Sequence, residues 1–176
     1  MAIIPVSRQR QMLTFRGKKI GCTDTCLAML GNGQALNGML LTEQIVRDVS
    51  GEKNPDPASP GLNQSQLVLA ASRLHFTYTD KTGGSWASFG AAVTARRLVV
   101  AQLWYAVIGG TAIGHAVLVI GRNDSGSYVY IDPMTGIART ATPTTFHKAM
   151  SAFSVRTGLP ATKLRFGVSR PVPAAK

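Results

Sequence analysis

The character of the sequence changes after Arg97, and this change constrains the fold more than any other feature. Before it, apolar residues recur at the spacing of one helix face, and turn residues separate the segments. After it, apolar runs rich in valine and isoleucine are separated by glycine-containing turns, as is typical of β-strands. Helices followed by an antiparallel sheet predict an α+β fold in which N-terminal helices pack on the sheet.

Capping residues predict where the helices of the first half begin. One helix is expected after Gly21 and ends at Gly31-Asn-Gly33. Three more are expected at the N-caps Thr42, Asn63 (with Gln66 in the capping-box position) and Ser85. Three prolines between Lys53 and Gly61 predict a loop there.

Three strands and one helix are predicted in the second half. The strands are Leu98–Ile108, His115–Ile120 and Tyr128–Ile131, and the turn at Asn123-Asp-Ser-Gly126 joins the last two into a hairpin. Thr142 and Pro143 then open a helix that is expected to run through Met150, since proline is favourable at the first helical position.

The size and composition indicate one globular domain. The chain has 176 residues, of which 45% are hydrophobic and 15% are charged, enough to bury a core. The longest apolar stretch, Leu98–Ile108, is shorter than the roughly 18 residues of a membrane span. The first apolar residues precede the N-terminal charges, the reverse of a signal peptide. We therefore expect a cytoplasmic or virion-associated protein, or one exported by a dedicated system.

The two cysteines exclude a disulfide scaffold and do not indicate a metal site. Cys22 and Cys26 lie four residues apart at a helix start, where bridging them needs unusual geometry. A zinc site needs two further ligands, and His75, His115 and His147 are all distant in sequence. No metal and no cofactor is expected.

The net charge of +11 is concentrated near the two ends of the chain. From Pro133 to Lys176 there are seven lysines or arginines and no acid, and five basic residues precede Asp24. Such ends can bind nucleic acid, an anionic cell wall or an acidic assembly partner. A solvated basic surface is the favoured interpretation, because no aromatic residues interleave the charges as in a strand-binding platform.

Cys22 is the candidate nucleophile. A thiol attacks as its thiolate, and the positive end of a helix favours that charge. Cys22 is expected at this position, in the first turn of its helix. Taken alone, a cysteine on a helix is more often a small buried hydrophobe. That interpretation applies to Cys26, which is expected one turn further on, among Leu27, Met29 and Leu30.

His115 and Asp132 are expected to meet across the predicted hairpin. His115 opens one strand after Gly114, and Asp132 follows the end of the next strand. In an antiparallel pair the start of one strand lies beside the end of its neighbour, so the hairpin alone brings the imidazole to the carboxylate. A carboxylate of this kind fixes the tautomer of a catalytic histidine. Only the contact with Cys22 requires the tertiary fold.

Three motifs in order resemble those of the papain-like cysteine peptidases, in particular the double-glycine leader peptidase domains of bacteriocin-exporting transporters. The motifs are Cys22-Thr-Asp-Thr-Cys-Leu-Ala-Met-Leu30, Gly114-His-Ala-Val-Leu-Val-Ile-Gly121 and Tyr128-Val-Tyr-Ile-Asp-Pro-Met-Thr-Gly136. The resemblance covers about residues 20–150. It implies a papain-like fold and a cysteine peptidase with Cys22 as nucleophile, His115 as general base and Asp132 as its orienting partner.

The sequence departs from the family pattern at two positions. Thr23 stands where the family usually has glycine or tryptophan. The family also has a glutamine about six residues before the cysteine that binds the developing oxyanion, and Arg16 occupies that position here. An insertion at Arg16-Gly-Lys-Lys19 would let Gln11 take the role of oxyanion donor.

These observations predict three regions and one favoured function. The regions are a basic N-terminal arm or strand over residues 1–19, a peptidase domain over 20–155 and a basic C-terminal tail over 156–176. The favoured function is hydrolysis of a peptide or amide bond, in a protein or a cell-wall peptide, through a thioester acyl-enzyme. The alternative is an inactive papain-like module that serves as a structural or binding component of a larger assembly such as a phage particle.

Overall fold

The computed structural model describes residues 3–15, 18–34, 40–52 and 61–174, apart from the side chains of residues 15 and 18. Its helices are α1 (Cys22–Asn32), α2 (Glu43–Ser50), α3 (Gln64–Arg73), α4 (Trp86–Thr94), the 3-10 helix η1 (Tyr105–Ile108) and α5 (Pro143–Arg156). Its strands are β1 (Thr14–Phe15), β2 (Lys18–Lys19), β3 (Thr79–Asp80), β4 (Arg97–Trp104), β5 (Gly114–Arg122), β6 (Tyr128–Asp132), β7 (Ile137–Ala141) and β8 (Phe166–Pro171).

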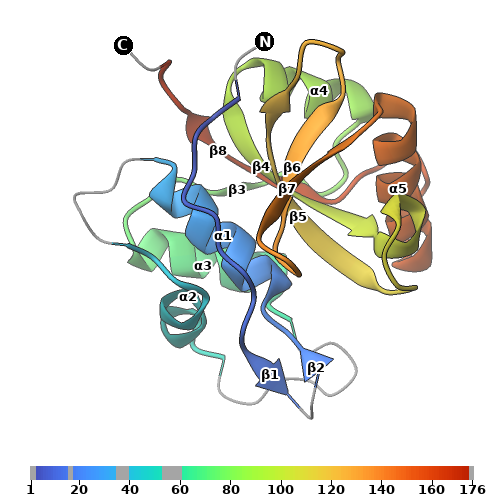
Figure 1. Cartoon of the computed structure of the whole chain (residues 1–176). Helices are drawn as coiled ribbons and strands as arrows, with labels where there is room; N and C mark the ends of the chain where they lie inside the picture. The colour runs from blue at the N-terminus through green and yellow to red at the C-terminus, as the bar shows by residue number, and fades with distance from the viewer. Residues whose placement is uncertain (1–2, 16–17, 35–39, 53–60, 175–176) are drawn as a thin grey trace.

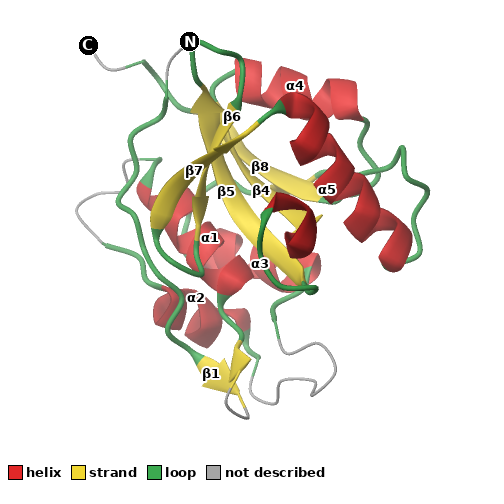
Figure 2. Cartoon of the chain, turned by 45° about the vertical axis from the view of Figure 1, so that its right-hand side comes forward, coloured by secondary structure: helices red, strands yellow, loops and turns green. Residues whose placement is uncertain are grey.

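A six-stranded antiparallel sheet separates two groups of helices (Figure 1). The strand order is β3-β8-β4-β5-β6-β7, and every neighbouring pair is antiparallel. Helices α1, α2 and α3 gather on one side of the sheet, and α4 and α5 lie on the other (Figure 2). The predicted α+β architecture, with N-terminal helices packed on an antiparallel sheet, is confirmed.

The apolar run of β4 is explained by its position inside the sheet. Leu98 and Val100 point into the core beneath α1, whereas Val99, Ala101 and Leu103 point into the core beneath α4 and α5. A strand covered on both faces needs apolar residues at successive positions, so the alternation typical of a half-exposed strand is absent. The hairpin of β5 and β6 continues the same two cores.

The predicted caps of the helices are confirmed. Thr42 and Ser85 each accept a backbone hydrogen bond from the residue three positions later, and Asn63 forms the full capping box with Gln66. Pro143 begins α5, which continues beyond the expected end at Met150 as far as Arg156. The predicted loop at 53–60 lies outside the described residues.

The two ends of the chain differ from the expected division into an arm and a tail. Phe166 and Val168 are buried in β8, which lies between β3 and β4 inside the sheet. Only two buried apolar residues alternate here, and Arg165 and Arg170 flank them, so the strand is hard to recognise in the sequence. At the other end, the backbone N–H of Ile4 donates to the carbonyl of Ile120, so the N-terminal arm lies against β5.

Helix α1 is almost completely buried, including a charged residue in its first turn. Nine of its eleven residues, Thr23 to Gly31, are buried. Among them Asp24 accepts a hydrogen bond of 2.7 Å from Nε of Arg47, itself buried on α2. Burial raises the pKa of Asp24 to about 6, against the lowering effect of the Arg47 charge. This ion pair joins α1 to α2.

No helix in the described part of the chain is long and apolar enough to cross a membrane.

Replacing Arg47 by alanine is expected to destabilise the protein strongly, because Asp24 would lose a cationic partner while staying buried. The free energy of unfolding should fall by about 3–5 kcal/mol, measured by urea denaturation at pH 7.5. Arg73→Ala is the matched control: Arg73 is an exposed arginine on α3 that donates to the carbonyl of Val49, and its loss should cost about 1 kcal/mol or less. Equal effects of the two substitutions would contradict this account of the buried pair.

Candidate active site

Cys22 is the first residue of α1 and is partly exposed. At this position its backbone N–H belongs to the first turn, whose amides have no partner inside the helix. Gly21 precedes it as the N-cap, and a Cβ at Gly21 would lie 1.9 Å from an oxygen of Glu43. A glycine is therefore needed for the close approach of α2 to the tip of α1.

His115 and Asp132 form a buried hydrogen-bonded pair. Nε2 of His115 lies 2.8 Å from Oδ1 of Asp132, and the side chains are each 1% exposed. The hairpin of β5 and β6 brings them together, as expected from the sequence. Because Asp132 occupies Nε2, the other ring nitrogen, Nδ1, is the one that can face a third group.

Cys22 is close enough to His115 to influence its pKa. Burial alone would lower the pKa of His115, but hydrogen bonds with Asp132 and with the Cys22 side chain, together with their negative charges, raise it to about 9. Burial would likewise raise the pKa of Asp132, but hydrogen bonds from His115, Tyr105 and the Met134 amide hold it below its usual value. The fold thus brings the three sequence-predicted residues together, and His115 and Asp132 share a hydrogen bond.

Tyr105 is a fourth member of this group, which the sequence reasoning missed. Its hydroxyl donates to Oδ2 of Asp132 at 2.5 Å, and its ring centroid lies 4.3 Å from that of His115. A Cβ at Gly110 would lie 2.0 Å from the Tyr105 ring, so a glycine is required there. The predicted strand Leu98–Ile108 includes Tyr105, whereas β4 ends at Trp104. The break into η1, which turns the ring toward Asp132, has no clear local signal beyond the following Gly109-Gly110.

Gln11 lies beside the turn that carries Asp132. Its backbone N–H donates to the carbonyl of Pro133 at 2.7 Å, and its Nε2 lies 3.8 Å from Sδ of Met134. The side chain is buried, and within the described part of the chain its Oε1 has no hydrogen-bond partner. Lys18 and Lys19 of the predicted insertion form β2, which pairs with β1; Arg16 and Gly17 lie outside the described residues.

The register of this hairpin shortens the path from Gln11 to Cys22. Thr14 pairs with Lys19, and the N–H of Ile20 donates to the carbonyl of Leu13 at 3.1 Å. Leu13 follows Gln11 by two residues and Ile20 precedes Cys22 by two, so this contact brings the two segments together.

The other cysteine has the environment of a core residue. Cys26 is fully buried in the core beneath α1, and burial raises the pKa of its thiol well above the usual value. A thiol of this kind is chemically inert. His147 stacks on Trp86 at 4.4 Å, and neither it nor His75 joins the group around Asp132. Within the described residues, no group of three or more potential metal ligands is found.

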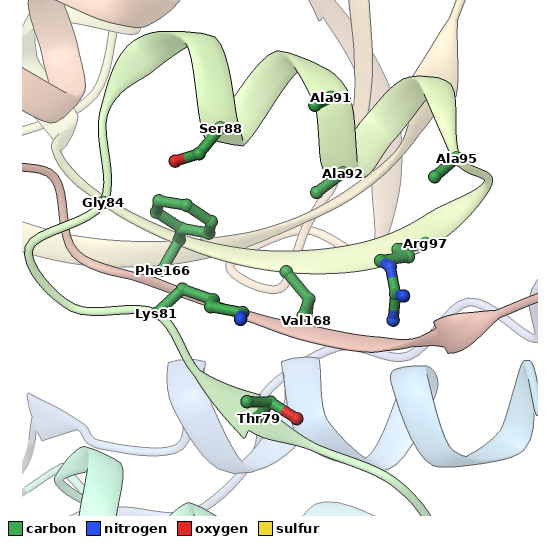
Figure 3. A pocket seen from close by; sticks show the side chains of 10 residues that line it. All are labelled: Thr79, Lys81, Gly84, Ser88, Ala91, Ala92, Ala95, Arg97, Phe166 and Val168. Atoms are coloured by element: carbon green, nitrogen blue, oxygen red, sulfur yellow. The ribbon is translucent and has the colours of Figure 1, made fainter.

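Two surface cavities flank the sheet and the arm. One of about 530 Å³ lies between α4 and the β3–β8 edge, lined by alanines of α4, by Phe166 and Val168 and by Lys81 and Arg97 (Figure 3). None of its lining residues belongs to the group around Cys22. The other, of about 510 Å³, adjoins Gln11 and is lined by residues of the arm and of the start of α2: Ser7, Arg8, Gln9, Arg10, Met12, Leu40, Thr42 and Glu43.

Comparison with protein-family models and with curated protein sequences gives no match. Solved structures do match along nearly the whole chain. A C39-like peptidase from Bacillus anthracis superposes with a TM-score of 0.67 at 18% identity, covering 99% of this chain and 98% of the other. The peptidase domain of Streptococcus ComA, a bifunctional ABC transporter of a quorum-sensing pathway, gives 0.56 at 13% identity, covering 93% and 98%. The chain therefore has the papain-like fold of the C39-like cysteine peptidases.

Proposed function

We propose that this protein is a cysteine peptidase that hydrolyses a peptide or amide bond, with Cys22 as nucleophile, His115 as proton carrier and Asp132 as the residue that orients His115. The observation that carries the proposal is the buried His115–Asp132 hydrogen bond of 2.8 Å, together with a partly exposed thiol, Cys22, at the N-terminus of α1. The C39-like fold supports the same reaction class.

His115 is the proton donor of the proposed reaction. With a pKa of about 9, the imidazole holds its proton at neutral pH. The sulfur of Cys22 then attacks the substrate carbonyl as thiolate, forming a C–S bond. As the C–N bond breaks, His115 gives its proton to the leaving amine. In the second half of the reaction the neutral His115 takes a proton from water, the hydroxide displaces the sulfur, and the protonated His115 is restored.

Gln11 and the first turn of α1 are proposed to stabilise the oxyanion. The backbone N–H of Cys22 has no intrahelical partner and points beyond the helix N-terminus. The Nε2 of Gln11 has a weak acceptor, Sδ of Met134, and keeps a second hydrogen for a stronger one. Two such donors are the usual composition of an oxyanion hole, in which one donor contributes about 100- to 1,000-fold in rate.

The substrate is proposed to lie along the cavity that adjoins Gln11. Arg8 and Arg10 line it together with Met12 and Leu40, whose side chains are largely exposed. A peptide with acidic and apolar side chains matches this lining. An anionic cell-wall peptide remains a candidate substrate on the same grounds.

An inactive module of the same fold is the second candidate. The observation in its favour is Thr23, whose buried hydroxyl donates to the carbonyl of Leu62 and so has a structural contact of its own. Rapid labelling of Cys22 by a thiol-reactive peptide at neutral pH would argue against this candidate, since it requires an activated thiol in a peptide-binding site.

Cys22→Ala is expected to lower peptide hydrolysis by at least about 1,000-fold, because the covalent intermediate can no longer form. The measurement is the cleavage of a mixed-sequence library of fluorogenic peptide amides. Cys26→Ala makes the same chemical change in the core and should keep the activity of the folded protein. Cleavage that survives in Cys22→Ala would contradict the mechanism.

The activity of the wild-type protein should fall as the pH rises through about 9. His115 holds its proton below that pKa and loses it above, and the neutral imidazole has no proton to give to the leaving amine. The check is kcat/KM for a cleaved peptide between pH 6 and pH 10.5. A profile that stays level to the upper end would be incompatible with His115 as the proton donor.

Asp132→Asn should lower the pKa of His115 from about 9, because the charge and hydrogen bond that oppose burial are weakened. The imidazole signals can be titrated by NMR, with His75 and His147 as internal references. Asp80→Asn, at an exposed aspartate of β3, is the matched control and should leave the His115 titration unchanged. An unchanged titration in Asp132→Asn would mean that Asp132 does not hold the proton on His115.

A further inference from the structure

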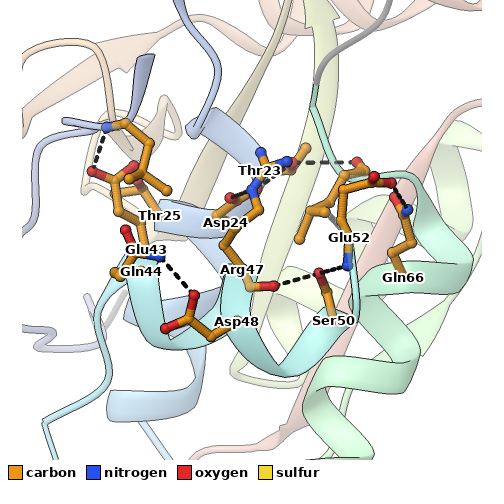
Figure 4. A network of polar contacts seen from close by, with 12 residues as sticks. Thr23, Asp24, Thr25, Glu43, Gln44, Arg47, Asp48, Ser50, Glu52 and Gln66 are labelled. Carbon is orange, nitrogen blue, oxygen red and sulfur yellow. Dashed lines mark hydrogen bonds and ion pairs between the residues drawn. The ribbon is translucent and has the colours of Figure 1, made fainter. Parts of the chain in front are cut away.

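Glu43 is a buried carboxylate that lies between the segment carrying Gln11 and the tip of α1. It is the first residue of α2 and is 6% exposed. Figure 4 shows its carboxylate beside Thr25, on the helix that begins with Cys22. A carboxylate is costly to bury unless its oxygens accept hydrogen bonds, so its partners indicate what it is fixed to.

One oxygen of Glu43 binds the segment that follows Gln11. Oε1 accepts from the backbone N–H of Met12 and from that of Leu13, the latter at 2.9 Å. On its other side Gln11 is fixed through its own N–H, which donates to the carbonyl of Pro133 at 2.7 Å. The backbone of Gln11 is thus tied both to Glu43 and to the turn that carries Asp132.

The other oxygen binds the helix of the nucleophile. Oε2 accepts from Oγ1 of Thr25 at 3.2 Å, three residues after Cys22. The same oxygen occupies the space where a side chain at Gly21 would begin, 1.9 Å from an ideal Cβ. Glu43 therefore touches the tip of α1 at the residue before the thiol and again within its first turn.

We propose that Glu43 is a positioning residue for the oxyanion site: its two oxygens fix the Gln11 segment against the tip of α1, and so set the place of the Gln11 carboxamide relative to the sulfur of Cys22. The proposal rests on the proposed peptidase function. Hydrogen bonds to a charged acceptor are short and strong, which suits a contact that must hold a loop segment.

This position matters because individual hydrogen bonds, and not a sheet or a helix, fix the segment. Gln11 lies in an extended stretch before the two-residue strand β1, not within the sheet or a long helix. A group that binds a transition state must be held within about 0.5 Å, and a misplacement of about 1 Å costs on the order of 100-fold in rate. Glu43 supplies that precision because its own backbone is fixed in α2.

The test is a set of substitutions at Glu43 and Gln11, with two readouts. The first is kcat for a fluorogenic peptide amide that the wild-type protein cleaves, a reaction that passes through an oxyanion. The second is the alkylation rate of Cys22 by iodoacetamide, which uses the thiolate but forms no oxyanion. Glu43→Ala should lower kcat by about 10- to 100-fold and change alkylation by less than about threefold.

A double-mutant cycle asks whether Glu43 acts through Gln11. In the Gln11→Ala background, Glu43→Ala should lower kcat by less than about threefold, because the donor it positions is already gone. Gln44→Ala is the matched control: Gln44 is the next residue of α2 and bonds Asp48 at the surface, so kcat should stay at the wild-type value.

If circular dichroism shows that Glu43→Ala does not fold, Glu43→Gln takes its place in the cycle. The amide oxygen of this variant still accepts from Met12 and Leu13 but carries no charge, and kcat is expected to fall by about 3- to 10-fold.

The outcomes separate this inference from the function on which it rests. Full additivity of the Glu43 and Gln11 substitutions, or a loss of alkylation as large as the loss of kcat, would overturn the positioning role and leave the peptidase intact. If the wild-type protein cleaves no peptide of the library and its Cys22 reacts no faster than a free cysteine, the peptidase function fails, and the positioning role fails with it.

Discussion

The burial of α1 is the constraint on which the rest of the structure depends. A helix with nine of eleven residues buried must be surrounded, and α2, α3 and the sheet surround it. Because side chains cover it on all sides, its N-terminus is the part that can bring a partly exposed thiol to the start of β5, where His115 lies. As a consequence, polar residues near that tip are buried. Asp24 and Thr25 need hydrogen-bond partners, and Arg47 and Glu43 of α2 provide them.

The proposed site is assembled from four separate parts of the chain, of which the first is the tip of α1 with Cys22. The hairpin of β5 and β6 holds His115 against Asp132, and η1 adds Tyr105 to the same carboxylate. The arm adds Gln11, bound to the Pro133 carbonyl. Tyr105 and Gln11 are joined to the hairpin by buried hydrogen bonds, which are strong in a low dielectric and costly to leave unmade. A single displaced part would therefore leave several polar groups without partners.

Electrostatics and position act together at His115. Burial by itself would favour a neutral ring, yet two acceptors, Asp132 and Cys22, reverse that preference. Asp132 in turn keeps its charge because His115, Tyr105 and the Met134 amide all donate to it. The pKa values of His115 and Asp132 are thus shifted by their partners, so the chemistry proposed here belongs to the group and not to any one of its members.

The sequence by itself determined the features that depend on neighbours in the chain. Capping residues located the helix starts, and hairpin geometry paired His115 with Asp132, because local hydrogen bonds and short turns are encoded in consecutive residues. Only the tertiary structure decided that Phe166–Pro171 enters the sheet, that Tyr105 turns onto Asp132 and that Glu43 joins two distant segments. Those contacts link residues from 18 to 89 positions apart, and no periodic pattern records which distant surfaces will meet.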